Sequence, residues 1–309
     1  MGAPCHRQHS LMKIVLAVQS VKPHETRAAW EPLVADLARK AGLGIGVMTA
    51  SQSDTVQALA SGEADLVWLS SSAAIDAVVD ADAEVIALYY NINGANGYKS
   101  VIAARADSGI QSLDEALAPG KYNYAGGAPT STSGYVLPQH FLFTPRKTTA
   151  DLLFKSVASD GHFPNLAALW ARKVDVIVNN TTDLAVFQAR TPGAQEGIVT
   201  LWESPLVPND VLMVRRDMQP AHRQRLAGLF MAYGETPGER ELFAKASGIS
   251  HFVPADNLLL DAVSGFKFAT ERALIEKNTA LDAGQQTLQL CALDQRVRKF
   301  NAAVKRLRA

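Results

Sequence analysis

Short apolar runs alternate with segments of helical periodicity along the first third of the chain. The first run, residues 12–18, is apolar apart from Lys13, which is typical of a strand covered on both faces. Three further runs of strand length lie at residues 45–49, 65–69 and 84–90. Between the runs, apolar side chains recur at helical spacing over residues 26–41, over residues 54–61 and after Ser70–Ser72. This order predicts a parallel sheet with helices on both faces.

The alternation returns after an extended segment, residues 98–104, which is suited to lead the chain into a second unit. We expect further strands at residues 122–126, 174–178, 198–202 and 211–214. We expect further helices at residues 113–116, up to Phe143, at 165–172 and 183–189, and then at 223–233, 238–247, 257–271 and 281–308. These segments predict two α/β lobes, with chain crossings near Ile102 and Val207 and a cleft between the lobes.

The crossings also predict how the chain divides. Residues 1–11 are expected to be a disordered tail or a tag, residues 12–101 with 208–309 the first lobe, and residues 102–207 the second lobe. The apolar stretch from Met12 to Val18 is too short for the core of a signal peptide. Either the protein is cytoplasmic, if the chain is full length, or a leader has been replaced or trimmed.

Composition excludes several classes of partner. The 309 residues carry 30 basic and 30 acidic side chains, so a general nucleic-acid or acidic-membrane partner is not suggested. The two cysteines, Cys5 and Cys291, give neither a disulfide framework nor a metal-ligand spacing, and no cofactor is implied. Six basic side chains lie between Arg296 and Arg308, which indicates a solvated helix that packs on the lobe or on a second copy in a homodimer.

The stretch from Thr130 to Pro138 carries the first sign of chemistry. Four hydroxyl side chains run into Gly134 and then into an apolar helical pattern. A helix start offers unpaired backbone N–H groups and the positive end of the helix dipole, and a glycine lets an anion approach the backbone closely. The stretch therefore predicts an anion site, with an ordinary serine or threonine cap as the alternative.

Two other polar turns follow predicted strands. One contains Ser70 and Ser71, and the other, residues 179–182, contains Asn180. The carboxyl ends of parallel strands meet at one edge of a sheet, so these turns and residues 130–133 are expected to converge on the cleft. Convergence favours the anion site over a simple cap.

Four ordered motifs, at residues 131–138, 161–184, 201–216 and 231–237, resemble the phosphonate-binding proteins of phosphonate ABC transporters. The resemblance runs from about residue 12 to about residue 270. It implies the type II periplasmic-binding fold, in which two α/β lobes joined by two crossing strands close on a ligand. It also implies a small phosphorus-oxyanion ligand, an ABC permease as partner and a periplasmic location.

The resemblance assigns roles to individual residues. Ser131, Thr132 and Ser133 match the turn that binds the phosphonate oxygens, and His162 matches a histidine that reaches the same group. Tyr98 matches an aromatic residue beside the organic substituent of the ligand. Asp210 matches an acid that faces the amine of 2-aminoethylphosphonate.

Two positions depart from the family members that prefer the aminoethyl compound. Gln52 stands where they carry a second tyrosine, and Thr182 stands where they carry a glutamate. A buried ammonium needs opposite charge to offset its lost hydration, so the resemblance implies a retained oxyanion site with weakened amine selectivity. Phosphate, phosphite and small phosphonates are then candidates. Asp210 could also accept a hydrogen bond from a protonated ligand oxygen and so discriminate against sulfate.

Enzymatic alternatives have less support in the sequence. It contains no GxSxG, HExxH or GxxxxGK[ST] motif, and His162 has no orienting acid nearby for a serine hydrolase. The same two-lobed fold occurs in cytoplasmic enzymes that act on a small carboxylate, such as the naphthoate synthases of the menaquinone pathway. A solute-binding sensor that docks on a receptor is a further alternative.

Overall fold

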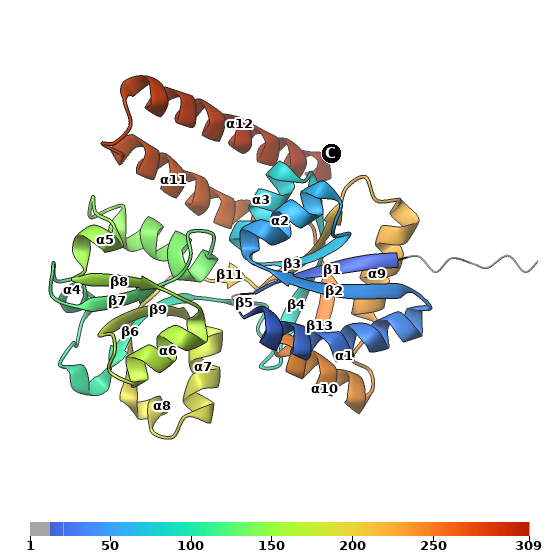
Figure 1. Cartoon of the computed structure of the whole chain (residues 1–309), viewed down its shortest axis with the longest axis horizontal. Coiled ribbons are helices and arrows are strands. Elements are labelled where there is room, and N and C mark those ends of the chain that lie inside the picture. The colour runs from blue at the N-terminus through green and yellow to red at the C-terminus, as the bar shows by residue number, and fades with distance from the viewer. Residues whose placement is uncertain (1–12, 21, 309) are drawn as a thin grey trace, which may run out of the picture.

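The computed structural model describes residues 13–20 and 22–308, which form two sheets flanked by helices (Figure 1). The predicted tail at residues 1–11, including Cys5, lies outside the described residues. The strands of the larger sheet are β1 (Lys13–Gln19), β2 (Gly44–Ala50), β3 (Leu66–Leu69), β4 (Ala83–Asn91), β12 (Val211–Arg215) and β13 (Ile249–Pro254). Their order across the sheet is β13-β4-β12-β3-β1-β2.

The larger sheet is mixed: its first four strands run in the same direction, as the parallel sheet predicted from them requires, but the two strands from later in the chain run against them. Strand β1 runs parallel to β2 and β3, but β12 lies antiparallel between β3 and β4, and β13 is antiparallel to β4. The returning chain enters β12 from the edge at which β3 and β4 end, and it must therefore run against them. Strand β13 was not predicted.

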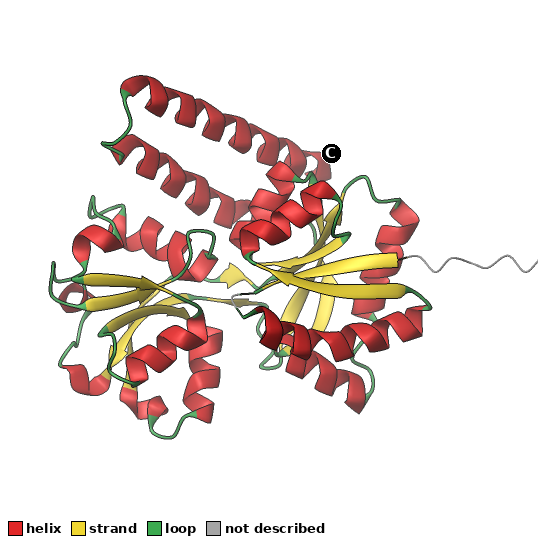
Figure 2. Ribbon diagram, in the orientation of Figure 1, coloured by secondary structure: helices red, strands yellow, loops and turns green. Residues whose placement is uncertain are grey.

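Helices cover both faces of the larger sheet (Figure 2). They are α1 (Pro23–Ala41), α2 (Gln52–Ser61), α3 (Ser71–Asp80), α9 (Pro220–Met231), α10 (Pro237–Ser247), the 3-10 helix η4 (Asn257–Leu260), α11 (Asp261–Lys277) and α12 (Ala283–Arg308). Alternate residues of β1 enter two separate cores, because successive strand side chains point to opposite faces. Leu16 and Val18 pack with α1, α9 and α10, whereas Ala17 packs with α2, α3 and α11.

The second sheet is built from the middle of the chain. Its strands are β6 (Ser100–Arg105), β7 (Asn123–Gly126), β8 (Ser156–Ser159), β9 (Val176–Asn180) and β10 (Ile198–Glu203), in the order β10-β6-β9-β7-β8. The flanking segments are η1 (Ala106–Ser108), α4 (Leu113–Ala116), η2 (Thr132–Val136), η3 (Gln139–Phe143), α5 (Ala150–Leu153), α6 (His162–Trp170), α7 (Thr181–Arg190) and α8 (Ala194–Gly197). Strand β8 was not predicted.

The helix expected to run up to Phe143 is instead two π-helical segments, η2 and η3, on either side of Leu137 and Pro138. Proline has no backbone N–H and cannot continue the hydrogen-bond ladder of an α-helix. Wider π turns of this kind are frequent at functional sites, and η2 includes two of the predicted ligand residues, Thr132 and Ser133.

Two short strands, β5 (Gly97–Tyr98) and β11 (Val207–Pro208), pair antiparallel and carry the chain between the sheets. The crossing requires a glycine, because a β-carbon at Gly97 would lie 2.4 Å from the carbonyl oxygen of Val207. Directly beyond the crossing, the backbone N–H of Ser100 donates to Ser204 Oγ, and the N–H of Ser204 donates to the carbonyl of Ser100, both at 2.9 Å. The second sheet therefore starts at Ser100, two residues before the predicted boundary.

The C-terminal helices α11 and α12 form a hairpin that rests on α3 (Figure 1). Two of the basic side chains of α12 are used within the chain, since Arg296 pairs with Asp76 and Asp80, and Arg306 pairs with Asp82. No described helix is long and apolar enough to cross a membrane.

Candidate ligand-binding site

Two polar turns meet at the crossing between the lobes, as their positions after strands had predicted. The backbone N–H of Ser72, in the first turn of α3, donates to Oγ1 of Thr132 in η2 at 2.9 Å. Thr132 is also hydrogen-bonded to Tyr98 of β5, which with β11 forms the hinge between the lobes. The Tyr98 phenol is buried, and this burial raises its pKa. The Thr132 hydroxyl is thus engaged with the first lobe and with the hinge.

Ser133 and His162 are brought together from η2 and the start of α6. The Oγ of Ser133 lies 3.2 Å from His162 Nε2. Ser133 is buried, and its carbonyl accepts a hydrogen bond of 2.7 Å from Ser100 Oγ. Burial lowers the pKa of His162 while the negative charge of Asp183 acts in the opposite sense. A neutral imidazole that donates from Nε2 leaves the Ser133 hydroxyl free to donate to an anion. We call Ser72, Thr132, Ser133 and His162 the hydroxyl cluster.

Three of the predicted ligand residues are occupied by structural hydrogen bonds. Ser131 Oγ caps η2 by accepting from the N–H of Gly134 at 3.0 Å, as the alternative of an ordinary cap had envisaged. Ser71 Oγ donates to the carbonyl of Pro208 in β11 at 3.2 Å. Asn180 caps α7 through its side-chain oxygen and donates to the Asp183 carboxylate at 2.9 Å. These bonds hold the polar turns and the hinge in place.

Asp210 follows the hinge strand β11, and two side chains that were not predicted hold it. Its Oδ2 accepts hydrogen bonds of 2.9 Å from Gln19 Nε2 and from Trp68 Nε1. Burial raises the pKa of Asp210 to about 6, with the Trp68 hydrogen bond lowering it and the charge of Asp183 raising it. Among the described residues Oδ1 has no hydrogen-bond partner, so one carboxylate oxygen is available to a ligand.

Gln52 lies on the same side of the site as Asp210. Its Nε2 donates to Ser70 Oγ at 3.2 Å, and the N–H of Ser70 donates to Gln19 Oε1 at 3.0 Å. The Oε1 of Gln52 is buried and has no hydrogen-bond partner in the described part of the chain. A buried amide oxygen without a partner is unfavourable by roughly 1–3 kcal/mol, which a ligand donor would offset.

Asp183 is a carboxylate that the sequence analysis missed. It follows the half-buried Thr182 in the first turn of α7, and its charge affects the pKa of Asp210, Tyr98 and His162. An acidic residue in a first helical turn has an ordinary explanation in the helix dipole, so its position alone did not single it out. We call Gln52, Asp183 and Asp210 the acceptor cluster.

A family model described as the periplasmic substrate-binding protein of a phosphonate ABC transporter matches residues 16–259. The chain belongs to this family. The family consists of substrate-binding transport proteins, and the predicted resemblance is confirmed. The substrate-binding protein of such an ABC transporter has two kinds of partner, a small ligand and a membrane permease.

Similar proteins support the fold over nearly the whole chain. The phosphonates-binding periplasmic protein of Escherichia coli K12 is 27% identical over 295 residues, which are 91% of this chain and 87% of that protein. A crystal structure of a binding-protein component of an ABC phosphonate transporter from Pseudomonas aeruginosa is 25% identical, with a TM-score of 0.82, and the match covers 97% of this chain and 100% of that one. A Prochlorococcus marinus protein in complex with methylphosphonate shares the fold, with 13% identity, a TM-score of 0.71 and coverage of 82% and 96%. The predicted type II periplasmic-binding fold is confirmed.

Within the described part of the chain, no group of three or more histidine, cysteine or acidic side chains is arranged to hold a metal.

Proposed function

We propose that this chain binds a small phosphonate, or a related phosphorus oxyanion, between its two lobes and delivers it to an ABC permease in the periplasm. The observation that supports this most is the meeting of both lobes at one polar site, through the hydrogen bond between Ser72 N–H and Thr132 Oγ1. A ligand that contacts both lobes favours the closed arrangement over the open one. Family membership supports the permease partner and the periplasmic location.

In this proposal the hydroxyl cluster binds the phosphorus oxyanion. Ser133 donates its hydroxyl hydrogen, and both α3 and α6 begin without a side-chain cap, next to Thr132 and Ser133 respectively. The buried ammonium group of Lys267 lies next to the first turn of α3, with its Nζ 3.4 Å from Ser72 Oγ. Because Lys267 forms ion pairs with Asp76 and Glu271, at 3.1 and 3.0 Å, its charge is largely neutralised and the helix termini remain the principal source of positive potential.

The acceptor cluster binds a hydrogen-bond donor on the organic part of the ligand. Asp210 Oδ1 and Gln52 Oε1 both lack partners among the described residues, and Asp183 adds a second negative charge. The expectation of weakened amine selectivity rested on Gln52 in place of a tyrosine and on Thr182 in place of a glutamate. Since Asp183 supplies a carboxylate one position further along, we keep 2-aminoethylphosphonate among the candidates with phosphate, phosphite and simple alkylphosphonates.

A thermal-shift series tests the proposal. The intact chain is heated with phosphate, phosphite, methylphosphonate, 2-aminoethylphosphonate or sulfate at one millimolar-scale concentration. A ligand present at about 100 times its dissociation constant stabilises the folded state by about 2.7 kcal/mol, which is a clear shift of the unfolding midpoint. Stabilisation by phosphorus oxyanions and not by sulfate supports the proposal, whereas no stabilisation by any of the five overturns it.

The predicted homodimer through the C-terminal helix needs a separate test. Arg296 and Arg306 are paired within the chain, and a dimer would have to use exposed apolar side chains of α12 such as Leu288 and Leu307. Light scattering on the eluted protein distinguishes a 33.2 kDa monomer from a dimer of twice that mass.

A further inference from the structure

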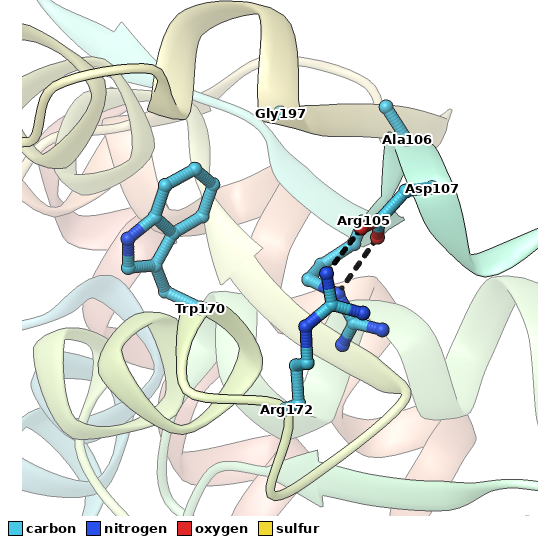
Figure 3. Close-up of a pocket in the computed structure, with 6 residues that line it drawn as sticks. All are labelled: Arg105, Ala106, Asp107, Trp170, Arg172 and Gly197. Atoms are coloured by element: carbon cyan, nitrogen blue, oxygen red, sulfur yellow. Dashed lines mark hydrogen bonds and ion pairs between the residues drawn. The ribbon is translucent and has the colours of Figure 1, made fainter.

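A cavity lies in the second lobe at the end of β6 that is remote from the interlobe site. Its volume is about 200 Å³, and it is lined by Arg105, Ala106, Asp107, Trp170, Arg172 and Gly197 (Figure 3). Ser100 begins β6 at the interlobe site and Arg105 ends the same strand. At a rise of about 3.3 Å per residue the two ends are roughly 17 Å apart. The ligand of the interlobe site therefore does not reach this cavity.

Two guanidinium groups in the cavity share one carboxylate. Arg105 Nε donates to Asp107 Oδ1 at 3.0 Å, and Arg172 Nη2 donates to Asp107 Oδ2. These contacts lower the pKa of Asp107, with the Arg172 hydrogen bond as the larger cause. The three side chains together carry one excess positive charge. The Arg105 side chain is also fixed to α6, because its Nη1 donates to the carbonyl of Leu169 at 3.4 Å.

Several of the guanidinium N–H groups are unused. Among the residues that the structure describes, Arg105 Nη2 and the Nε and Nη1 of Arg172 have no hydrogen-bond partner. The side chain of Arg105 is 11% exposed and that of Arg172 is 63% exposed, so an anion can reach these donors from solvent. A guanidinium fork that faces a cavity with free N–H groups matches a carboxylate or a phosphate.

The backbone places both walls of the cavity. Arg172 has a φ of +61° because it is the left-handed residue of the turn that ends α6, where the N–H of Lys173 donates to the carbonyl of Ala168 at 2.9 Å and the N–H of Arg172 to that of Leu169 at 3.1 Å. Gly197 sits against the indole of Trp170, where a β-carbon would lie 2.5 Å from the ring. The helix end therefore carries one guanidinium to the cavity, and the glycine admits the ring that forms its other wall (Figure 3).

We propose that this cavity is a second anion site, which takes the carboxylate or phosphate group of a small molecule on the N–H groups of Arg105 and Arg172 that Asp107 does not use. The excess positive charge attracts the anion and the unused N–H groups orient it. Asp107 stays in place and keeps the two guanidinium groups together. The site does not depend on what the interlobe site binds.

The indole N–H signals of the protein in nitrogen-15 NMR spectra separate the two sites. The chain has four tryptophans, of which Trp170 lines the cavity and Trp68 donates its indole N–H to Asp210 in the interlobe site. Each signal is assigned by a tryptophan-to-phenylalanine variant. Inorganic phosphate and acetate are then titrated separately at fixed ionic strength. We expect a saturable shift of the Trp170 signal with at least one of the two anions, and their relative effect identifies the preferred group.

Variants make the test specific. Arg172→Gln should weaken the anion dependence of the Trp170 signal at least about tenfold, because it removes one fork of donors. Arg172→Lys, which keeps the charge without the fork, should weaken it less. Arg146→Gln removes an equally charged residue from the same lobe that does not line the cavity, and it should leave the titration unchanged. An unshifted Trp170 signal, or the same shift in Arg172→Gln, overturns the proposal, and a shift of Trp68 alone supports the interlobe site without it.

Discussion

The hydroxyl cluster and the acceptor cluster differ in what they can offer a ligand. In the hydroxyl cluster, Ser133 and the helix termini present hydrogen-bond donors without a formal positive charge. In the acceptor cluster, Asp210 Oδ1 and Gln52 Oε1 present acceptors beside the second carboxylate of Asp183. A ligand that satisfies both must carry an oxyanion and a donor on the same small skeleton. The comparison teaches that selectivity can be divided, with one cluster selecting the anion and the other selecting its substituent.

Replacing Asp210 should distinguish the roles of the two clusters most strongly. In Asp210→Asn we expect affinity for 2-aminoethylphosphonate to fall by at least about 100-fold, because truncating one side of a buried charged pair costs several kcal/mol. Affinity for methylphosphonate should change by less than about threefold. Isothermal titration with both ligands measures this, and Asp217→Asn, at an exposed acid, is the control. Equal losses of affinity for both ligands would show that the acceptor cluster does not recognise the organic substituent of the ligand.

The same carboxyl group predicts a pH dependence of stability without ligand. Burial raises the folded-state pKa of Asp210 to about 6, from an ordinary value of 3.8. The folded state therefore binds the proton more tightly, and this stabilisation is complete below about pH 4 and lost as the pH rises through 6. Relative to Asp210→Asn, the wild type should lose about 2 kcal/mol of unfolding free energy between pH 4 and pH 7. Urea unfolding at several pH values measures the difference, and parallel pH profiles contradict the assignment.

Removing the Ser133 hydroxyl should act on every ligand alike. Ser133→Ala deletes one donor to the oxyanion, so we expect affinity for methylphosphonate and for 2-aminoethylphosphonate to fall by about tenfold each. Ser156→Ala, in an exposed strand of the same lobe, should have no effect. A loss confined to the amine would reverse the roles that we give the two clusters.

The smallest expected effect belongs to the contact between the lobes. Thr132→Val removes the acceptor of the Ser72 N–H, which is worth about 1 kcal/mol, and should reduce the apparent affinity for all ligands by about fivefold. Thr132→Ser keeps the hydroxyl and should restore binding. Small-angle scattering should show a larger radius of gyration for Thr132→Val without ligand, and an unchanged radius with unchanged affinity excludes a role in closure.

Strand and helix patterns predicted most elements, because burial on both faces leaves a clear mark on a sequence. The insertion of β12 between β3 and β4 could not be predicted in the same way, since strand order depends on where the chain returns from the second lobe. Strand β13 lies at the sheet edge, and its buried positions, Ile249 and Phe252, do not follow the alternation that marks a strand. Pro138 was visible, but its conversion of a helix into two π-helical segments was not.

For the site, the motif around Ser133 and the distant His162 could be joined only through the family resemblance. The hydrogen bonds that occupy Ser131, Ser71 and Asn180 are local, yet a serine that caps a turn and a serine that binds an anion have the same sequence signature. Gln19 and Trp68 were missed because they lie in apolar strands, where neither position suggests a partner for Asp210.

The reciprocal hydrogen bonds of Ser100 and Ser204 have a consequence for the modular history of the chain. All five strands of the second sheet come from one uninterrupted segment, and its two ends already touch. Such a segment can be inserted into, excised from or exchanged between host proteins through a junction of a few residues, because joining neighbouring ends needs little loop closure. The second lobe is in this sense an exchangeable module. Recombination at a single locus could replace the half of the binding site that it contributes and leave the other half intact.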